Sequence, residues 1–580
     1  MIHDTFSPTD EQARAITHEG AAFIAACPGS GKTRVLIERA RLLLTNSIQG
    51  RGIAFLSFTT AAISELESRM QQEGLLKTPA FPHFIGTFDS FLWTFFVAPF
   101  GVPGCSSRPR LISDKDDFKI KPHDGARELP LGCFDRTTGA AIQSRLKEYK
   151  FRGSIVAHET AATNVRSRFL ERGELDFAEA RELALKRLRD GITAHTLVRA
   201  LGARFMELVV DETQDCNPED LEIINCFRQA NIAIKVVCDP HQTIYGFRGG
   251  VADELLKFRE SFPQEQRLSI CGNFRSSQNI ASAISAFRCM DGRSKIDEAL
   301  GGNHDDPNPV YILSYPGTTV PATVGTEFHE LTEAAGFKAS ECPVVAATRK
   351  SCANALGHPS DQTGKYLSCR LALAIGNYHL SFELGTRRKA LNEIHKILVM
   401  IQNPDLEKTY HQFIVENEIE PNSWRPTVIN LANALQYEKG CFNTAESWLD
   451  QARKLLASLI PPGGSSINQR LRKVEYLGQA LTCTMPTGHC ARTIHSVKGM
   501  EFPAVCVVMS PQKTKGILDY LTSGNPVSSG EDARKIYVGA SRAKHLLVIA
   551  VPSSQAGRLK SLLDATGANV ELTEINCSNS

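Results

Sequence analysis

The fold is decided by the stretch Ala26-Cys27-Pro28-Gly29-Ser30-Gly31-Lys32-Thr33. It reads A-x-x-x-x-G-K-T, the spacing of a Walker A phosphate loop, with alanine at the usual first glycine. Small apolar residues precede it from Ala21, as in a buried strand, and helical spacing follows from Val35 to Leu44. In this context backbone N–H groups and the positive helix N-terminus can cradle a polyphosphate.

A second motif, far downstream, completes the same chemistry. Leu208-Val209-Val210-Asp211-Glu212 is an apolar strand that ends in two acids, the Walker B arrangement. We expect Lys32 to reach the β- and γ-phosphates, and Thr33 and Asp211 to ligate Mg²⁺. Glu212 is expected to polarise the attacking water. The two motifs together predict hydrolysis of a nucleoside triphosphate.

Composition describes an ordinary globular protein of several domains. At 580 residues the chain is too long for one hydrophobic core. Its net charge of +2 neither requires nor excludes a nucleic-acid partner, since a basic groove can sit within a balanced total. Cysteines are scattered without a C-x-x-C pair, which favours reduced thiols. No signal peptide or run of about 18 apolar residues is present, so we expect a cytoplasmic protein with no membrane partner.

Short apolar runs bounded by turn residues predict the strands of parallel sheets in two α/β halves. The runs are Ile53–Phe58, Leu208–Val210, Ile234–Cys238, Val310–Leu313, Pro343–Thr348, Val505–Met509 and Leu546–Val551. A long stretch of mainly helical character interrupts each half. The predicted fold is therefore α/β, with two parallel-sheet domains that each carry a mainly helical insertion.

Further short motifs lie in both halves of the chain. In chain order they are Phe6–Ile16, Ser57–Ala62, Gly86–Phe91, Asp211–Asp215, Cys238–Gly249, Asn273–Ser276, Thr493–Phe502 and Tyr537–Ala543. In this order they resemble the motifs of superfamily 1A DNA helicases of the UvrD/PcrA/Rep type. The resemblance implies two RecA-like domains that bind ATP and Mg²⁺ between them and drive 3′-to-5′ movement on single-stranded or tailed duplex DNA.

The strand-like runs, the two stretches that interrupt them and the polar C-terminal residues give the domain boundaries. The first RecA-like domain would cover 1–91 and 200–272, with the insertion 92–199, and the second would cover 273–350 and 482–565, with the insertion 351–481. Residues 566–580 would form a polar tail.

Four residues outside the phosphate loop are assigned to the nucleotide by the resemblance. Gln12 would read the adenine edge, because a carboxamide donates and accepts in one plane. Arg34 and Phe274 would sandwich the base, since phenylalanine keeps the π-face of the family's tyrosine. Glu501 would contact the ribose.

Three further residues are assigned to catalysis, with Lys32 and Glu212. Gln242 would sense the γ-phosphate, and Arg275 and Arg542 would act as arginine fingers from the second domain. An arginine finger raises the rate by roughly 10³–10⁵.

The family's DNA contacts map onto loops and strand ends. The matching residues are Phe58, Thr59, Thr87, Tyr245, Phe247 and His495. Aromatic stacking suits a sequence-tolerant motor, because every base has a π-face. The sequence departs from the family at Asp89, where the usual residue is histidine. An acid facing a phosphate backbone would repel it, which puts a DNA role for Asp89 in doubt.

After the last motif, the family's duplex-separating hairpin has no counterpart that we can identify, and no fused nuclease domain is visible. An alternative is therefore a DNA-gated ATPase subunit that regulates a partner such as a separate nuclease, with little unwinding of its own. An RNA-directed motor is a second alternative.

Overall fold

The computed structural model describes residues 6–45, 50–76, 80–112, 115–244, 252–288, 296–357, 365–380, 384–403, 409–438, 442–475, 477–482 and 488–575. The chain divides into two compact units. One contains residues 1–99, 180–360 and 486–580, and the other contains residues 100–179 and 361–485.

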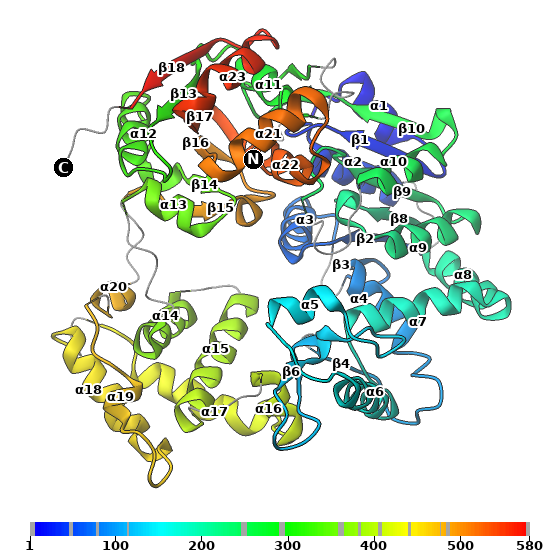
Figure 1. Cartoon of the computed structure of the whole chain (residues 1–580). Helices are drawn as coiled ribbons and strands as arrows, with labels where there is room; N and C mark the ends of the chain where they lie inside the picture. The colour runs from blue at the N-terminus through cyan, green and yellow to red at the C-terminus, as the bar shows by residue number, and fades with distance from the viewer. Residues whose placement is uncertain are drawn as a thin grey trace. The chain divides into compact units, whose positions relative to one another are not determined.

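The first sheet has the strand order β10-β1-β9-β8-β2-β3, and all its strands are parallel (Figure 1). Its strands are β1 (Ala22–Ala26), β2 (Gly52–Ser57), β3 (Phe84–Thr87), β8 (Phe205–Val210), β9 (Ile234–Cys238) and β10 (Arg267–Ile270). Helices α1 (Asp10–Thr17), α2 (Lys32–Thr45) and α3 (Thr60–Gln72) cover one face. Helices α4 (Phe88–Leu92), α9 (Pro218–Gln229) and α10 (Ala252–Glu260) cover the other.

Burial on both faces explains why the central strands β1, β2, β8 and β9 read as mostly apolar runs. Along β1, Phe23 packs into the core on one face and Ile24 into the core on the other. This alternation is the period of two that an extended chain imposes.

The second sheet is also parallel throughout, in the order β15-β14-β16-β17-β13-β18. Its strands are β13 (Val310–Tyr315), β14 (Val344–Ala346), β15 (Ala491–Thr493), β16 (Phe502–Val508), β17 (Ala543–Pro552) and β18 (Val570–Glu574). Helices α11 (Gln278–Ser285), α21 (Pro511–Ser523), α22 (Gly530–Ala540) and α23 (Ser553–Asp564) pack on one face. Helices α12 (Thr323–Ala334) and α13 (Arg349–Ala355) pack on the other.

The predicted α/β class with two parallel sheets is confirmed, and each of the seven apolar runs contains or overlaps a strand. The prediction of a tail over 566–580 was wrong in part. Residues 570–574 form β18, which pairs with β13 from Val310↔Val570 to Ser314↔Glu574. The segment reads as polar because β18 is an edge strand whose residues after Val570 are exposed to solvent.

The first insertion is shorter than the predicted 92–199. Helices α7 (Phe177–Arg189) and α8 (Gly191–Arg204) bury Leu185 and Leu201 in the core of the first sheet, as the π-helical turn Trp93–Val97 buries Phe96. The insertion itself therefore spans 100–179. It contains the short pairs β4 (Arg110–Leu111) with β7 (Glu174–Leu175) and β5 (Lys119–Ile120) with β6 (Leu129–Pro130), and helices α5 (Gln143–Glu148) and α6 (Val156–Glu171).

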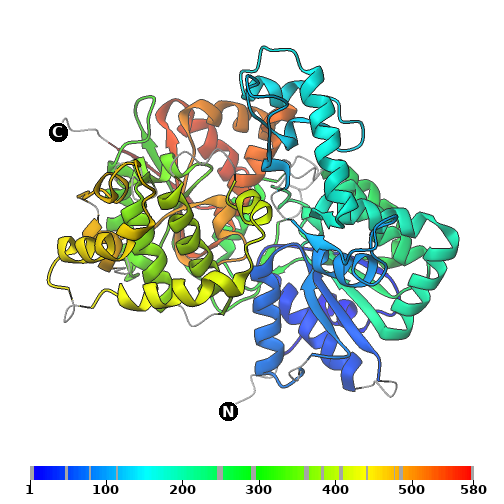
Figure 2. The same cartoon turned by 90° about the horizontal axis from the view of Figure 1, so that it is seen from below.

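The second insertion is a helical bundle, as expected (Figure 2). Its helices are α14 (Leu367–Leu380), α15 (Leu384–Gln402), α16 (Tyr410–Glu416), α17 (Pro421–Ala434), α18 (Ala445–Leu456), α19 (Ile467–Arg470) and α20 (Leu477–Thr482). Trp448 is fully buried in its core, where its indole N–H donates to the carbonyl of Leu435 at 2.7 Å. Among the residues that the structure describes, no helix is both long enough and apolar enough to span a membrane.

Candidate active site

The phosphate loop connects β1 to α2 and turns through two left-handed glycines. Gly29 has φ +72° and Gly31 has φ +74°, a region that glycine reaches at no steric cost. The Lys32 ammonium folds back over the loop and donates to the carbonyl of Cys27 at 3.2 Å. Helix α2 begins at Lys32, so the loop presents a helix N-terminus, as the sequence predicts.

The two acids of the second motif stand at the carboxyl end of β8. Glu212 has φ +55°, and its N–H donates to Asp211 Oδ1 at 2.8 Å. The pKa of Asp211 is raised to about 7, because the carboxyl is enclosed by protein and lies beside the Glu212 carboxylate. Burial would also raise the pKa of Glu212, but Lys498, Lys32 and Arg542 outweigh it and hold that pKa below its ordinary value. Hydroxyl and carboxylate oxygens, such as those of Thr33 and Asp211, are the ligands that Mg²⁺ prefers.

Lys498 joins the second sheet to these acids and was not among the predicted catalytic or binding residues. Its side chain is almost fully buried, and its ammonium lies 2.6 Å from Asp215 Oδ2 and 3.5 Å from Glu212 Oε2. It belongs to the motif Thr493–Phe502, and this membership was the signal available in the sequence. Lys498, from the second α/β half, therefore orients Asp215 and Glu212 in the first and offsets their negative charge.

Gln242, the predicted γ-phosphate sensor, and Arg542, a predicted arginine finger, are in direct contact. Arg542 Nη2 donates to Gln242 Oε1 at 3.1 Å, and Gln242 Nε2 donates to Asp239 Oδ2 at 2.8 Å. The Tyr537 hydroxyl donates to the same Asp239 oxygen at 3.3 Å. Burial lowers the pKa of Arg542 to about 9, with a further contribution from the nearby Arg275 cation. Asp239 and Tyr537 were missed by the sequence assignments, although both lie inside matched motifs.

The second predicted finger is held by an acid. Arg275 Nε donates to Glu501 Oε1 at 2.8 Å, and its Nη1 donates to the carbonyl of Ser541 at 2.8 Å. Lys544 lies 3.1 Å from the other Glu501 oxygen. Burial would raise the pKa of Glu501, but the Arg275 and Lys544 cations lower it to about 2. The structure thus places Glu501 beside Arg275.

These contacts bring motifs of both sheets together around one phosphate loop. The UvrD/REP helicase N-terminal domain model matches residues 8–263, and the UvrD-like helicase C-terminal domain model matches residues 491–554. The two matches together cover more than half of the chain. The chain belongs to the UvrD/Rep helicase family.

Relatives of this UvrD/Rep-family chain are named as DNA helicases, and two of the three described next are named as ATP-dependent. The putative ATP-dependent DNA helicase YjcD of Bacillus subtilis is 22% identical over 94% of this chain and 79% of its own length. ATP-dependent DNA helicase PcrA of Leuconostoc citreum is 26% identical over 48% of this chain and 38% of its own length. DNA helicase II of Escherichia coli is 25% identical over 53% of this chain and 43% of its own length. The chain thus matches less than half of the length of these last two relatives.

The predicted base-binding residues Gln12 and Phe274 both contact the phosphate loop, Gln12 through its side chain and Phe274 through its backbone. Gln12 is buried, its Nε2 donates to the carbonyl of Ser30 at 3.0 Å, and its Oε1 accepts the N–H of Thr9 at 3.1 Å. The Phe274 N–H donates to the carbonyl of Gly29 at 2.8 Å, and its ring is partly exposed.

Arg34 makes ion pairs with Glu38 at 2.9 Å and Glu73 at 3.0 Å, and its guanidinium stacks over Phe6. No interaction between Arg34 and Phe274 is seen among the described side chains. The base sandwich of Arg34 and Phe274 therefore stays a prediction.

The family's predicted DNA contacts at the first sheet lie at strand ends, as expected. The hydroxyls of Thr59 and Thr87 cap the N-termini of α3 and α4, accepting backbone N–H groups at 3.3 and 3.2 Å. The Phe58 ring is partly buried and stacks on the fully buried Phe88, with ring centroids 5.2 Å apart. These local roles account for the residues without DNA, so their contact with DNA stays a prediction.

The remaining predicted DNA contacts concern the segment after β9. Tyr245 and Phe247 lie outside the described residues. His495 Nε2 lies 3.2 Å from the carbonyl of Ile244 and thereby links the last described residue of that segment to the second sheet.

Asp89 forms an ion pair within the protein at the position where the family has histidine. Its Oδ1 accepts from Arg181 Nη2 at 2.7 Å, and Arg181 also pairs with Asp220 at 2.5 Å. Arg181 comes from α7, which the sequence had assigned to the insertion. Because this cation is close, the repulsion of DNA expected from Asp89 is weakened.

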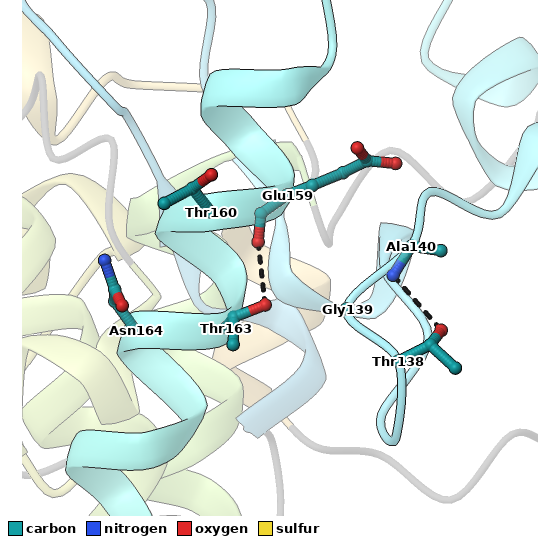
Figure 3. A pocket seen from close by; sticks show the side chains of 7 residues that line it. All are labelled: Thr138, Gly139, Ala140, Glu159, Thr160, Thr163 and Asn164. Atoms are coloured by element: carbon teal, nitrogen blue, oxygen red, sulfur yellow. Dashed lines mark hydrogen bonds between the residues drawn. The ribbon is translucent and has the colours of Figure 1, made fainter.

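A shallow hollow of about 350 Å³ lies in the first insertion, between α6 and the turn at Gly139 (Figure 3). Thr138, Thr160, Thr163, Asn164 and Glu159 line it with hydroxyl, amide and carboxylate groups. Thr163 Oγ1 donates to the carbonyl of Glu159 at 3.0 Å, and Glu159 Oε1 accepts the N–H of Ala141 at 2.8 Å. The lining holds no cationic side chain, so the hollow lacks the charge that a polyphosphate requires.

Proposed function

We propose that the chain is an ATP-dependent DNA helicase that moves 3′ to 5′ along single-stranded DNA. The observation that carries this proposal is the pair of contacts Arg542–Gln242 and Lys498–Asp215, which join both sheets at the phosphate loop. The names of the relatives support DNA as the substrate, and the order of the motifs supports the direction.

Each residue of the site has a role that its position supports. The loop N–H groups and Lys32 bind the phosphates of ATP. Glu212 is kept ionised by the surrounding cations, so it can accept a proton from the attacking water. Bound Mg²⁺, held by Thr33 and Asp211, would supply charge neutralisation at the β- and γ-phosphates.

Arg275 and Arg542 would stabilise the charge that develops on the γ-phosphate. Both now bond to protein carbonyl or carboxylate oxygens, so the phosphate would replace partners of similar chemistry. When ATP binds, the two arginines would exchange their protein partners for the γ-phosphate, and hydrolysis would reverse the exchange. ATP binding would thus draw the two sheets together, and hydrolysis would let them separate. These alternating movements would translocate single-stranded DNA over the surface of the two sheets.

ATPase turnover tests the proposal, measured with no nucleic acid, single-stranded DNA, duplex DNA and RNA. Strand displacement on 3′- and 5′-tailed duplexes is measured beside it, with Lys32→Ala as the inactive control. We expect stimulation by single-stranded DNA and displacement on the 3′-tailed duplex. Stimulation by RNA alone, or displacement on the 5′-tailed duplex alone, contradicts the proposal. DNA-stimulated turnover without displacement would reduce it to translocation without unwinding.

A further inference from the structure

Two cysteines stand where adjacent strands of the first sheet end. Cys27 follows β1 and lies in the phosphate loop, and Cys271 follows β10. These strands are parallel, and their last register pair is Ala26↔Ile270. Cys27 and Cys271 are therefore the next residues on two strands whose spacing is about 4.8 Å.

Backbone contacts confirm that the two residues are neighbours. The Cys27 N–H donates to the carbonyl of Ile270 at 3.0 Å, and its thiol lies 3.6 Å from the carbonyl of Gly272. These carbonyls belong to the residues before and after Cys271. Cys27 therefore contacts the backbone on either side of Cys271. A disulfide needs a Cα separation of roughly 4.4–6.8 Å, which the strand spacing satisfies.

The two thiols differ in their access to solvent. Cys27 is 8% exposed, and burial raises the pKa of its thiol well above the usual value. Cys271 is partly exposed, and its N–H donates to Glu11 Oε2 at 2.6 Å. A small oxidant in solution therefore reaches the Cys271 thiol more readily than the buried Cys27 thiol.

We propose that Cys27 and Cys271 form a reversible disulfide that switches off ATP hydrolysis when hydrogen peroxide is present. The Cys271 thiol loses its proton, and the thiolate attacks peroxide and breaks the O–O bond. A sulfenic acid forms, and the hydroxide that leaves takes up the released proton to become water. The Cys27 sulfur then attacks the Cys271 sulfur, the S–S bond forms and the S–O bond breaks. A second water leaves with the Cys27 proton. Two thiols are oxidised, one peroxide is reduced to two waters, and a dithiol reductant reverses the change.

The position of this bond explains why it would affect the ATPase, and this part rests on the proposed function. Cys271 opens the segment that leads from the first sheet to Arg275. Gly29 and this segment are already packed closely, since a Cβ on Gly29 would lie 2.4 Å from Asn273 Oδ1. A crosslink would lock the phosphate loop to that segment, so the phosphate contacts and the finger could not adjust independently when ATP binds.

The test treats the full chain with hydrogen peroxide, blocks the remaining thiols and searches a non-reduced digest by mass spectrometry for a peptide joining Cys27 to Cys271. We expect this peptide, and a loss of DNA-stimulated turnover on the order of 10²-fold, the cost of misplacing reacting groups by about 1 Å. Dithiothreitol should restore the rate. Cys271→Ser should keep its basal turnover and resist peroxide.

Cys226→Ser is the matched control, because it removes another partly exposed thiol, on α9, and should stay sensitive to peroxide. Absence of the joined peptide in treated wild-type protein overturns the proposal, as does full peroxide sensitivity in Cys271→Ser. The peptide is detected by mass and needs no ATPase activity. A chain that forms the link but has no basal turnover would therefore contradict the proposed function and leave the thiol chemistry standing.

Discussion

Gly29→Ala tests whether the phosphate loop positions the second sheet's catalytic residues. A Cβ at this position would lie 2.4 Å from Asn273 Oδ1 and 2.7 Å from Arg275 Cβ. Asn273 Oδ1 also accepts the N–H groups of Arg275 at 2.8 Å and Ser276 at 3.1 Å. The added methyl group therefore pushes on the anchor that sets the backbone of Arg275.

The magnitude has a backbone part and a steric part. Alanine at φ +72° costs about 1–2 kcal/mol, because its Cβ approaches the following carbonyl oxygen. Gly74→Ala carries the same backbone cost at φ +70°, but has no atom within 4 Å of the new Cβ. The steric part moves Asn273 by about 1 Å, and a displacement of that size can lower a rate by on the order of 10²-fold.

DNA-stimulated kcat and the melting temperature are measured for both variants. We expect both to lose stability, and Gly29→Ala alone to lose about 10²-fold in kcat. Equal kcat in the two variants would refute the reasoning, since the contact with Asn273 would then have no bearing on catalysis.

Four further outcomes are expected. Glu212→Gln should bind ATP normally but lose about 10²–10⁴-fold in turnover, because an amide cannot accept the proton; a matching loss of ATP affinity would make Glu212 structural. Arg275→Ala and Arg542→Ala should each lower kcat by about 10³-fold with ATP binding retained, and unchanged kcat in both contradicts their assignment. Phe247→Ala should weaken single-strand binding by about 1–3 kcal/mol with DNA-free ATPase and melting temperature unchanged. Burial lowers the pKa of His395 to about 4, so its contribution to stability is present above about pH 6.5 and is lost as pH falls toward 4; urea unfolding at pH 7 and 5 should show this loss in wild type and less of it in His395→Gln.

The sequence predicts the central strands of both sheets because they are buried on both faces. It misses strands that carry exposed or polar residues, such as β18, whose residues after Val570 are exposed, and β10, which contains Arg267 and Ser269. Helix α7 was assigned to the insertion because its surface is charged, although Leu185 and Leu188 face the core. Amphipathic helices look alike in sequence whether they cover a sheet or extend an insertion.

The residues of the site also differ in how well the sequence predicts them. Lys32, Asp211 and Glu212 are predictable because their motifs are local in sequence and dictate their own geometry. The partners of Asp239 and Glu501 are not, since Tyr537 and Arg275 approach from hundreds of residues away. Pairings such as Arg181 with Asp89 depend on which helix covers which face, and no spacing rule in the sequence specifies that choice.

Strands β14 and β15 flank the second insertion and lie side by side, with Val344 paired to Ala491. The chain thus leaves and rejoins one sheet at neighbouring positions, and everything in between forms a single crossover. The entropy of closing such a crossover grows only with the logarithm of its length, by about 0.6 kcal/mol for each doubling. The length of the insertion therefore has little effect on the stability of the sheet. Another bundle could replace this one during evolution, provided that its two ends lie as close together as neighbouring strands.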